Sequence, residues 1–403
     1  MEIKKAERRK AKKIMPRSTI IFILVLTILA SILGYNYFIQ PFANLKSTVI
    51  EQTESTIGGN KKTDLNLKSD NQFTIEQQLA QLIAFPYSLD INESTQSAML
   101  SWIEEYQPGA VTLFGEKVST SAAKFTIGQI NSGFDSDLSP LIVVDHEGGS
   151  VQRFSGVGFT DLPSWKSICS TDSTQRQNLL TTSAQELSQV GVEVVFAPVI
   201  DVASQSAILK DRVCSPDPTI VTKRAIEFID IFSQQKILSV IKHFPGIGSI
   251  STDLHHNYDE VNVSEEEILV FKDLLDTYSF LGVMSAHVGV KERYEGIPCS
   301  LNSDCIGDLN DFFSQALIFT DALDMSSAGH IAESEELMPL AERSVLAVMA
   351  GNDILVFGPN VKLIDIEKVF SALETAYQAD EKFQQQVEKS VEKILQYKAF
   401  LRQ

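Results

Sequence analysis

Short apolar runs recur along the chain, separated by stretches whose apolar residues have helical spacing. Eight runs are of strand length: Leu79–Phe85, Ala110–Phe114, Leu141–Val144, Val192–Phe196, Leu238–Ile241, Leu281–Met284, Leu317–Phe319 and Ile354–Phe357. Continuous apolar runs that alternate with helices are typical of parallel strands covered on both faces. The pattern therefore predicts an α/β fold with a (β/α)8 TIM-type barrel.

An open, doubly wound sheet would show the same alternation. Such sheets bind dinucleotides through a GxGxxG turn after the first strand, and no such turn follows the first run. Eight strands within residues 73–403 favour the barrel, and we expect one folded domain there. Thr74 is a predicted N-cap. The final segment, Asp380–Leu401, has helical spacing and is expected to pack on the barrel exterior.

The chain before residue 73 has a different pattern. Residues 1–17 carry eight basic and two acidic side chains, residues 18–39 carry no charge, and residues 40–72 are mostly polar. An uncharged stretch of ~20 residues can span a bilayer, and a basic flank stays in the cytoplasm. We predict a cytoplasmic flank at 1–17, a single-pass transmembrane signal anchor at 18–39 and a linker at 40–72. The barrel domain would then lie outside the cytoplasm, attached to the cell membrane.

A cleavable signal peptide is the alternative to an anchor. Its apolar region should span ~7–15 residues and precede a small-x-small cleavage site. The apolar region here is longer, and no clean site follows it. The first cysteine is Cys169, so no lipid-modified cysteine follows the segment.

Charge and cysteine content narrow the function. The formal net charge is −18, and the basic flank makes the rest of the chain more acidic still, which argues against a nucleic-acid partner. The four cysteines show no CxxC spacing, so a zinc or redox site is disfavoured. Outside the cytoplasm they could form disulfides. Cys299 and Cys305 are the closest pair, but all three pairings remain open.

Polar side chains follow five consecutive predicted strands. They are Asp145, Glu147 and Arg153 after the third, Asp201 and Arg212 after the fourth, Lys242, His243, Asp253 and His255 after the fifth, His287 after the sixth, and Asp321 and Asp324 after the seventh. One Asp after a strand is usually a helix cap. Five such ends at one face of a barrel indicate an active site. Asp353 precedes the eighth run and is expected to be structural.

These residues favour chemistry on a polyhydroxylated substrate. Glycoside hydrolysis needs a nucleophile or base on one face of the sugar and a proton donor on the other. Asp321, at a strand end, is rigidly held and suits a nucleophile. His255, on a Gly-containing loop, can donate and accept a proton near neutral pH, and Asp253 could orient it.

Four motifs in these segments resemble those of bacterial β-N-acetylhexosaminidases of glycoside hydrolase family 3, over roughly Phe73 to Asn360. They are DHEGGSVQR at residues 145–153, FAPVIDV at 196–202, KHFPG at 242–246 and FTDALDM at 319–325. The resemblance implies that Asp321 forms a covalent glycosyl-enzyme with retention of configuration. It implies that His255, paired with Asp253, is the acid/base on a mobile loop.

The resemblance also implies a set of sugar contacts: Asp145, Arg153, Arg212, Lys242 and His243. His287 is predicted as a further substrate contact, with a buried, hydrogen-bonded support as its alternative. No metal or organic cofactor is implied. The expected function is removal of terminal β-N-acetylglucosamine from glycans such as peptidoglycan fragments, by a catalytic domain that is monomeric.

The chain departs from the family pattern at several positions. Ile247 and Ser249 replace the second His and the Asp of KHFPGHGD, Ser150 replaces the Arg of EGGR, His146 replaces the Gln of DQEGG, and Leu254 separates Asp253 from His255. These changes place the loop and the subsites around the sugar in question. They leave the proposed dyad and nucleophile intact.

Other readings of the same residues remain open. One is a catalytically weak glycan-binding barrel, which Ile247 and Ser249 motivate. A second is a β-glucosidase or a phosphorylase that transfers the sugar to phosphate, for which a neutral His repels phosphate less than a carboxylate would. A third is a metal hydrolase that uses His243, Asp253, His255 and His256.

Overall fold

The computed structural model describes residues 73–134, 138–204, 206–294, 296–330, 334 and 336–403. The predicted cytoplasmic flank, anchor and linker at 1–72 lie outside these residues. Within the described part of the chain, none of the helices combines the length and the apolarity that crossing a bilayer requires. The described residues belong to a compact unit, Ser69–Gln403.

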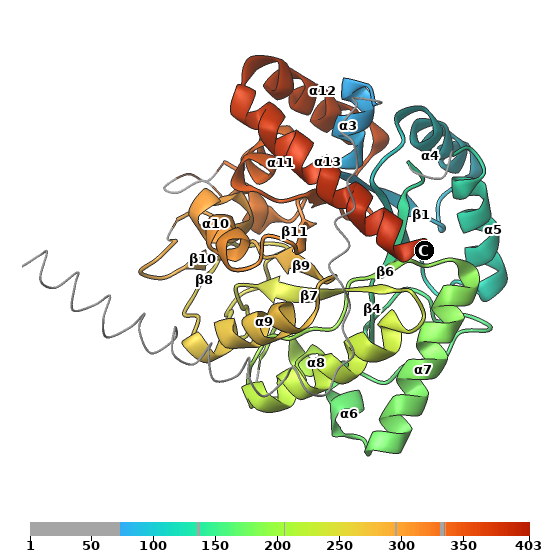
Figure 1. Cartoon of the computed structure of the whole chain (residues 1–403), viewed down its shortest axis with the longest axis vertical. Helices are drawn as coiled ribbons and strands as arrows, with labels where there is room; N and C mark the ends of the chain where they lie inside the picture. The colour runs from blue at the N-terminus through green and yellow to red at the C-terminus, as the bar shows by residue number, and fades with distance from the viewer. Residues whose placement is uncertain (1–72, 135–137, 205, 295, 331–333, 335) are drawn as a thin grey trace, which may run out of the picture. The chain divides into compact units, whose positions relative to one another are not determined.

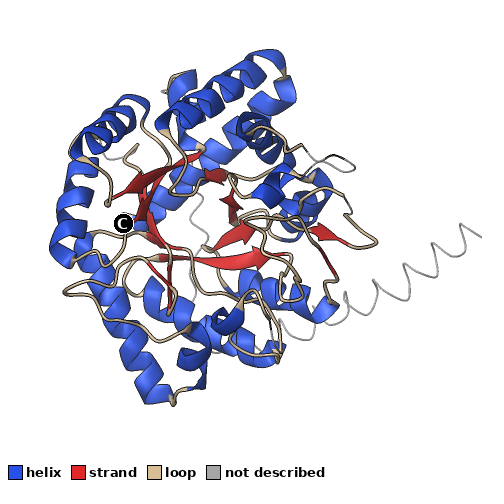
Figure 2. Ribbon diagram, turned by 180° about the vertical axis from the view of Figure 1, so that it is seen from behind, coloured by secondary structure: helices blue, strands red, loops and turns tan. Residues whose placement is uncertain are grey.

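Eight parallel strands close into a barrel at the centre of this unit (Figure 2). The order around the barrel is β1, β12, β11, β9, β7, β6, β3 and β2. The bounds are β1 Ile83–Ser88, β2 Ala110–Phe114, β3 Leu141–Val144, β6 Val194–Val195, β7 Leu238–Phe244, β9 Gly282–Ser285, β11 Leu317–Ala322 and β12 Ile354–Val356. The predicted α/β barrel is therefore confirmed, and all eight apolar runs supply strand residues.

Helices surround the barrel and connect its strands (Figure 1). Their bounds are α3 Ile75–Gln81, α4 Glu93–Tyr106, α5 Thr120–Asn131, α6 Trp165–Ser170, α7 Ser173–Val190, α8 Pro218–Ser233, α9 Glu265–Thr277, α10 Ser303–Phe312, α11 Leu340–Ala350, α12 Leu363–Ala379 and α13 Glu381–Leu401. Each buries one apolar face, as α8 does through Val221, Phe228 and Phe232. Such faces cover the strands and explain why the strands are apolar on both sides.

The first apolar run proves to be divided between a helix and a strand. Thr74 and Gln77 form a capping box that starts α3, which confirms Thr74 as an N-cap. Leu79 is on the buried face of this helix, and β1 begins only at Ile83. The prediction of one strand over Leu79–Phe85 was wrong because the apolar face of the helix runs directly into the strand.

The C-terminal helix α13 lies across the N-terminal end of the barrel rather than on its side (Figure 1). Ile394, Tyr397 and Leu401 pack against residues at the starts of the strands. The Tyr397 hydroxyl accepts hydrogen bonds from the amides of Leu281 and Leu317. This corrects the predicted exterior position, because the apolar face of the helix fills the open end of the barrel.

Asp353 also lies at this closed end, as expected for a structural residue. It is buried, accepts from the amide of Ile318 at 2.9 Å and pairs with Lys393 of α13 at 2.7 Å. The opposite end of the barrel is left for the polar strand ends.

Two disulfides link segments around the barrel. Of the three pairings that the sequence left open, the structure has Cys299 joined to Cys305 and Cys169 joined to Cys214. The second bridge ties α6 to the chain just after the short 3-10 helix η1, Lys210–Arg212. It therefore restrains the segment that carries Arg212.

Candidate active site

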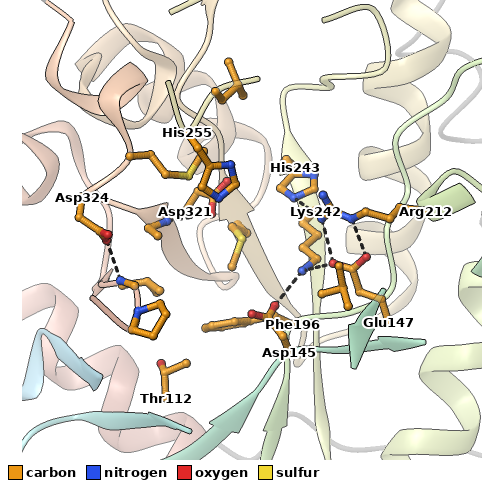
Figure 3. A pocket seen from close by; sticks show the side chains of 18 of the residues that line it. Thr112, Asp145, Glu147, Phe196, Arg212, Lys242, His243, His255, Asp321 and Asp324 are labelled. Carbon is orange, nitrogen blue, oxygen red and sulfur yellow. Dashed lines mark hydrogen bonds and ion pairs between the residues drawn. The ribbon is translucent and has the colours of Figure 1, made fainter. Parts of the chain in front are cut away.

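A cavity of about 330 Å³ opens at the C-terminal end of the barrel. Most of its polar lining comes from the segments after β3, β6, β7 and β11, which are four of the five strand ends that the sequence predicted. Of the predicted site residues, the following line it: Asp145, Arg153, Arg212, Lys242, His243, Asp253, His255 and Asp321. Figure 3 shows His255 and Asp321 across the cavity from Lys242, Glu147 and Arg212.

A tight hairpin brings Arg153 back to Asp145. Strands β4 (His146–Gly148) and β5 (Val151–Gln152) pair antiparallel, and the Arg153 amide donates to the carbonyl of Asp145. Gly148 has φ +93°, and a Cβ there would lie 2.3 Å from the carbonyl oxygen of Pro163. Glycine is therefore required at this turn. The hairpin leaves the side chains of Arg153 and Asp145 3.5 Å apart.

Glu147 is the centre of a buried ion-pair cluster. The Arg212 guanidinium donates to both of its oxygens, at 2.8 and 2.9 Å. Lys242 Nζ lies 2.6 Å from Glu147 and 3.1 Å from Asp145. Burial alone would raise the pKa of Glu147, but Lys242 and Arg212 outweigh it and lower that pKa to about 2. The cluster is thus ionised and rigid.

The two cations of this cluster both have raised pKa values. Burial would lower the pKa of Lys242, yet Glu147 and Asp145 raise it above its ordinary value. The pKa of Arg212 is raised too, because Glu147 outweighs the cost of burial. A charged ammonium and a charged guanidinium therefore face the cavity, where they can donate to hydroxyl or carbonyl oxygens of a ligand.

His243 is fixed from below by Asp201. Its Nδ1 lies 2.7 Å from the Asp201 carboxylate, which also accepts from the Ile247 amide at 2.8 Å. Both side chains are buried. With Nδ1 donating to the carboxylate, Nε2 is directed toward Arg212, 3.4 Å from its guanidinium. Asp201 thus positions His243.

Asp321 lies at the end of β11 on the wall of the cavity opposite the ion-pair cluster. Its Oδ1 accepts from the amide of Ala322 at 2.8 Å. Burial would raise the pKa of Asp321, but His243, His287, the Ala322 amide and Lys242 together lower it. An ionised carboxylate held by its own backbone has the charge and the rigidity that a nucleophile needs.

His287 lies outside the cavity lining, beneath Asp321. It is fully buried, its Nδ1 lies 2.6 Å from the Ser300 hydroxyl, and its Nε2 lies 3.0 Å from the carbonyl of Ala322. Burial lowers its pKa. The prediction that His287 contacts substrate is therefore corrected. Both ring nitrogens are occupied by the protein, which matches the alternative of a buried support.

His255 and Asp253 form a dyad on the loop after β7. His255 Nδ1 lies 2.9 Å from Asp253 Oδ1, which also accepts from the His255 amide at 3.0 Å. That amide bond is the main reason why the pKa of Asp253 is lowered. The side chains are 70% and 49% exposed, so a ligand can reach the imidazole. The carboxylate orients Nδ1 and leaves Nε2 available for proton transfer.

Four other residues have no part in the proposed chemistry. Asp324 accepts from the Gly358 amide at 2.6 Å, while His256 is exposed. Trp102 and Trp165 are buried in the core. Within the described ranges, no three His, Cys, Asp or Glu side chains are grouped to hold a metal ion.

Sequence reasoning missed the central role of Glu147 and the positioning role of Asp201. Both were noticed after predicted strands, but neither was assigned to the site. One signal was present in the sequence: two nearby acids, Asp145 and Glu147, could pair with the two cations Lys242 and Arg212. An acid that binds protein cations and one that binds substrate look alike in a sequence.

The chain is similar to a known protein family and to named proteins. The family described as "Glycosyl hydrolase family 3 N terminal domain" matches residues 74–397. The protein named Beta-hexosaminidase from Idiomarina loihiensis is 33% identical over 225 residues, which are 53% of this chain and 66% of that protein. The Beta-hexosaminidase of Nitrosomonas eutropha is 28% identical over 292 residues, 66% of this chain and 80% of that protein.

A solved structure supports the fold. The β-N-acetylhexosaminidase from Beutenbergia cavernae superposes with a TM-score of 0.71 at 24% identity, covering 81% of this chain and 99% of that one. This likeness concerns the barrel architecture.

Proposed function

The chain belongs to glycosyl hydrolase family 3, and from that premise we propose that it is a retaining exo-β-N-acetylglucosaminidase. It is proposed to remove terminal β-N-acetylglucosamine from glycans such as peptidoglycan fragments. The observation that carries the proposal is the placement of Asp321 and the His255–Asp253 dyad in one cavity, opposite the cluster of Lys242, Arg212 and Glu147.

In the first step, Asp321 attacks the anomeric carbon of the sugar. The carboxylate is ionised and held by the Ala322 amide, so its free oxygen can form the new bond. As the bond to the leaving oxygen breaks, His255 donates its proton to that oxygen. This step releases the leaving group as an alcohol and leaves the sugar bound to Asp321 as a glycosyl ester.

In the second step, His255 takes a proton from water, which attacks the same carbon and releases Asp321. Two displacements at one carbon restore its original configuration. Asp253 stabilises the imidazolium in the first step and keeps the ring in the same orientation for the second. One imidazole thereby serves as acid and then as base.

The opposite wall provides recognition of the sugar. Asp145, Lys242 and Arg153 offer one anionic and two cationic groups to its hydroxyls. Arg212 offers a donor for an N-acetyl carbonyl, and His243 Nε2, which faces that guanidinium, can accept from a sugar hydroxyl. Phe196 and Met284 line the same cavity and give an apolar surface for the carbon face of the ring. A charged cavity of this size at the end of the barrel suits the end of a glycan chain.

The proposal includes an extracytoplasmic, membrane-anchored location. The uncharged segment at 18–39 with its basic flank supports an anchor. Both disulfides support an oxidising compartment, where such bonds persist. A catalytic unit outside the cytoplasm would meet cell-wall glycans directly.

The test is hydrolysis of 4-nitrophenyl N-acetyl-β-D-glucosaminide and 4-nitrophenyl β-D-glucoside by the full-length protein. We expect turnover of the first at a much higher kcat/KM, and a loss of at least about 10³-fold in Asp321→Asn. The matched control is Asp365→Asn, an exposed acid on α12. Turnover confined to the glucoside, or a sugar 1-phosphate as the product in phosphate buffer, would overturn the proposed specificity or reaction.

A further inference from the structure

The loop that carries His255 has a carboxylate that the catalytic scheme does not use. Asp259 lies at the end of this loop and is half-buried. Its Oδ2 accepts from the Ser251 amide at 2.6 Å, from the Ser251 hydroxyl at 3.0 Å and from the Thr252 amide at 3.3 Å. These donors directly precede Asp253, so Asp259 holds the backbone that leads into the dyad.

Asp259 is itself fixed to the barrel. Its carbonyl accepts from the Gly289 amide at 3.0 Å. The next residues form β8, Glu260–Val261, which pairs with β10, Gly289–Val290, just after barrel strand β9. The carboxylate is therefore mounted on a two-stranded ribbon that continues from the barrel wall.

The far side of the loop is joined to the segment that carries Asp321. The amides of Ser326 and Ser327 donate to the carbonyls of His255 and Leu254, each at 3.2 Å. The ring of Tyr258 stacks on His330, with centroids 3.8 Å apart and planes 4° from parallel. The His255 loop is thus held on both sides.

An apolar base completes the support. Ile247, Ile250 and Leu254 are buried members of the main core. Gly248 passes so close to the chain that a Cβ there would lie 2.0 Å from the Val202 carbonyl oxygen. Ile247 and Ser249 stand where the resembled motif has His and Asp.

We propose that Asp259 is a positioning residue that fixes His255 for proton transfer over Asp321. This inference rests on the proposed function. Fixing the Ser251–Asp253 backbone sets the position of the Asp253 carboxylate, which in turn orients the imidazole. Misplacing a catalytic group by ~1 Å can cost about 10²-fold in rate, and general acid catalysis supplies about 10²–10⁴-fold.

The test compares two leaving groups in the full-length protein. Phenyl N-acetyl-β-D-glucosaminide needs a proton on its leaving oxygen, whereas the 2,4-dinitrophenyl glycoside departs without one. For Asp259→Ala we expect kcat/KM on the phenyl glycoside to fall about 10- to 100-fold. On the dinitrophenyl glycoside it should change less than about threefold. Because His255 also serves as base, kcat on the second substrate should fall and azide should restore it.

Two further variants separate positioning from folding. Asp259→Asn keeps an acceptor oxygen and should recover part of the activity lost in Asp259→Ala. Asp380→Ala removes a carboxylate that caps α13 at the Lys382 amide, away from the cavity, and should leave both kcat/KM values unchanged.

Equal losses of kcat/KM on the two substrates in Asp259→Ala, or no loss of kcat/KM on either, would contradict the proposal. A wild-type protein inactive on both glycosides would instead overturn the proposed function and this inference with it. The inference alone would be overturned if the wild-type protein is active and Asp259→Ala keeps the wild-type ratio of kcat/KM on the phenyl glycoside to kcat/KM on the dinitrophenyl glycoside.

Discussion

The amide of Ser326 donates to the carbonyl of His255 at 3.2 Å. This backbone hydrogen bond joins the loop of the proposed acid/base to the segment that follows the proposed nucleophile. The two groups that must act on the same glycosidic bond are therefore positioned relative to each other by main-chain contacts. Sites built in this way keep their geometry without relying on the ligand.

Replacing Asp253 by Asn should change the pH dependence of catalysis. The pKa of Asp253 is lowered, chiefly by the His255 amide, so the carboxylate stays ionised throughout the neutral range. An ionised carboxylate stabilises an imidazolium, and Asn does not. The alkaline limb of the kcat/KM profile on an unactivated aryl glycoside should move to lower pH, and kcat should fall at least about tenfold.

The control for this variant is Asp365→Asn, which alters an exposed carboxylate paired with Lys368. Its pH profile should match that of the wild type. An unshifted alkaline limb in Asp253→Asn would show that the dyad does not set the ionisation of the acid.

Glu147→Gln should destabilise the protein near neutral pH. The substitution removes the anion shared by buried Lys242 and partly exposed Arg212, and only Asp145 still pairs with Lys242. Breaking a buried ion pair typically costs about 3 kcal/mol or more. The pKa of Glu147 is lowered to about 2 from its ordinary 4.5, so its contribution is full above pH 4.5 and is lost as the pH falls toward 2. In Glu147→Gln, stability should therefore fall less than in the wild type as the pH drops from 4.5 toward 2. Urea unfolding at several pH values measures both effects.

The exposed acid Glu105 offers a matched control, and Glu105→Gln should keep the wild-type stability and acid dependence. If Glu147→Gln proves as stable as the wild type at pH 7, the buried cluster is not the structural centre of the recognition wall.

His146→Gln should remove a loss of stability in mild acid. Burial lowers the pKa of His146 to about 4 from 6.5, and its Nε2 lies 2.7 Å from the Ser183 hydroxyl. Between these values the unfolded chain binds a proton that the folded chain does not, so stability falls as the pH drops from 6.5 to 4. Gln carries no such proton and can still bond Ser183. If the stability of His146→Gln falls between pH 6.5 and pH 4 as steeply as that of the wild type, this account is contradicted. The control is His256→Gln, which changes an exposed histidine.

Removing the Cys169–Cys214 disulfide should cost more stability than removing Cys299–Cys305. The first closes a chain separation of 45 residues and the second one of 6. Loop-closure entropy then gives losses of about 4 and about 2 kcal/mol for the two double Cys→Ser variants. Because the first bridge restrains the chain beside Arg212, its loss should also raise KM. Equal losses of stability for the two variants would contradict the loop-length argument.

Much of the barrel could be predicted from the sequence, because buried parallel strands must be apolar on both faces. Ala110–Phe114 and Leu141–Val144 agree with the structure at both ends. Prediction failed where two apolar surfaces adjoin. The face of α3 continues into β1, and the face of α13 fits an end of the barrel as well as its side.

The candidate site was predicted in the same uneven way. Residues such as Asp321 and Lys242 were identified because barrel strand ends converge at one face. His287 stands at the same kind of position but points away from the cavity into Ser300. Glu147 was missed because its role depends on Arg212, which lies 65 residues further along the chain in the short helix η1. Which way a side chain points at a strand end is decided by contacts between distant segments.

The most direct test of the central claim is the mass of the full-length protein during turnover. In His255→Ala, 2,4-dinitrophenyl N-acetyl-β-D-glucosaminide should glycosylate the enzyme, because this leaving group needs no acid, while release by water is slow. We predict that intact mass spectrometry detects one added N-acetylglucosamine, that peptide mapping places it on Asp321, and that azide removes it. An adduct on another residue, or rapid turnover by Asp321→Ala, would contradict the assignment of Asp321 as the nucleophile.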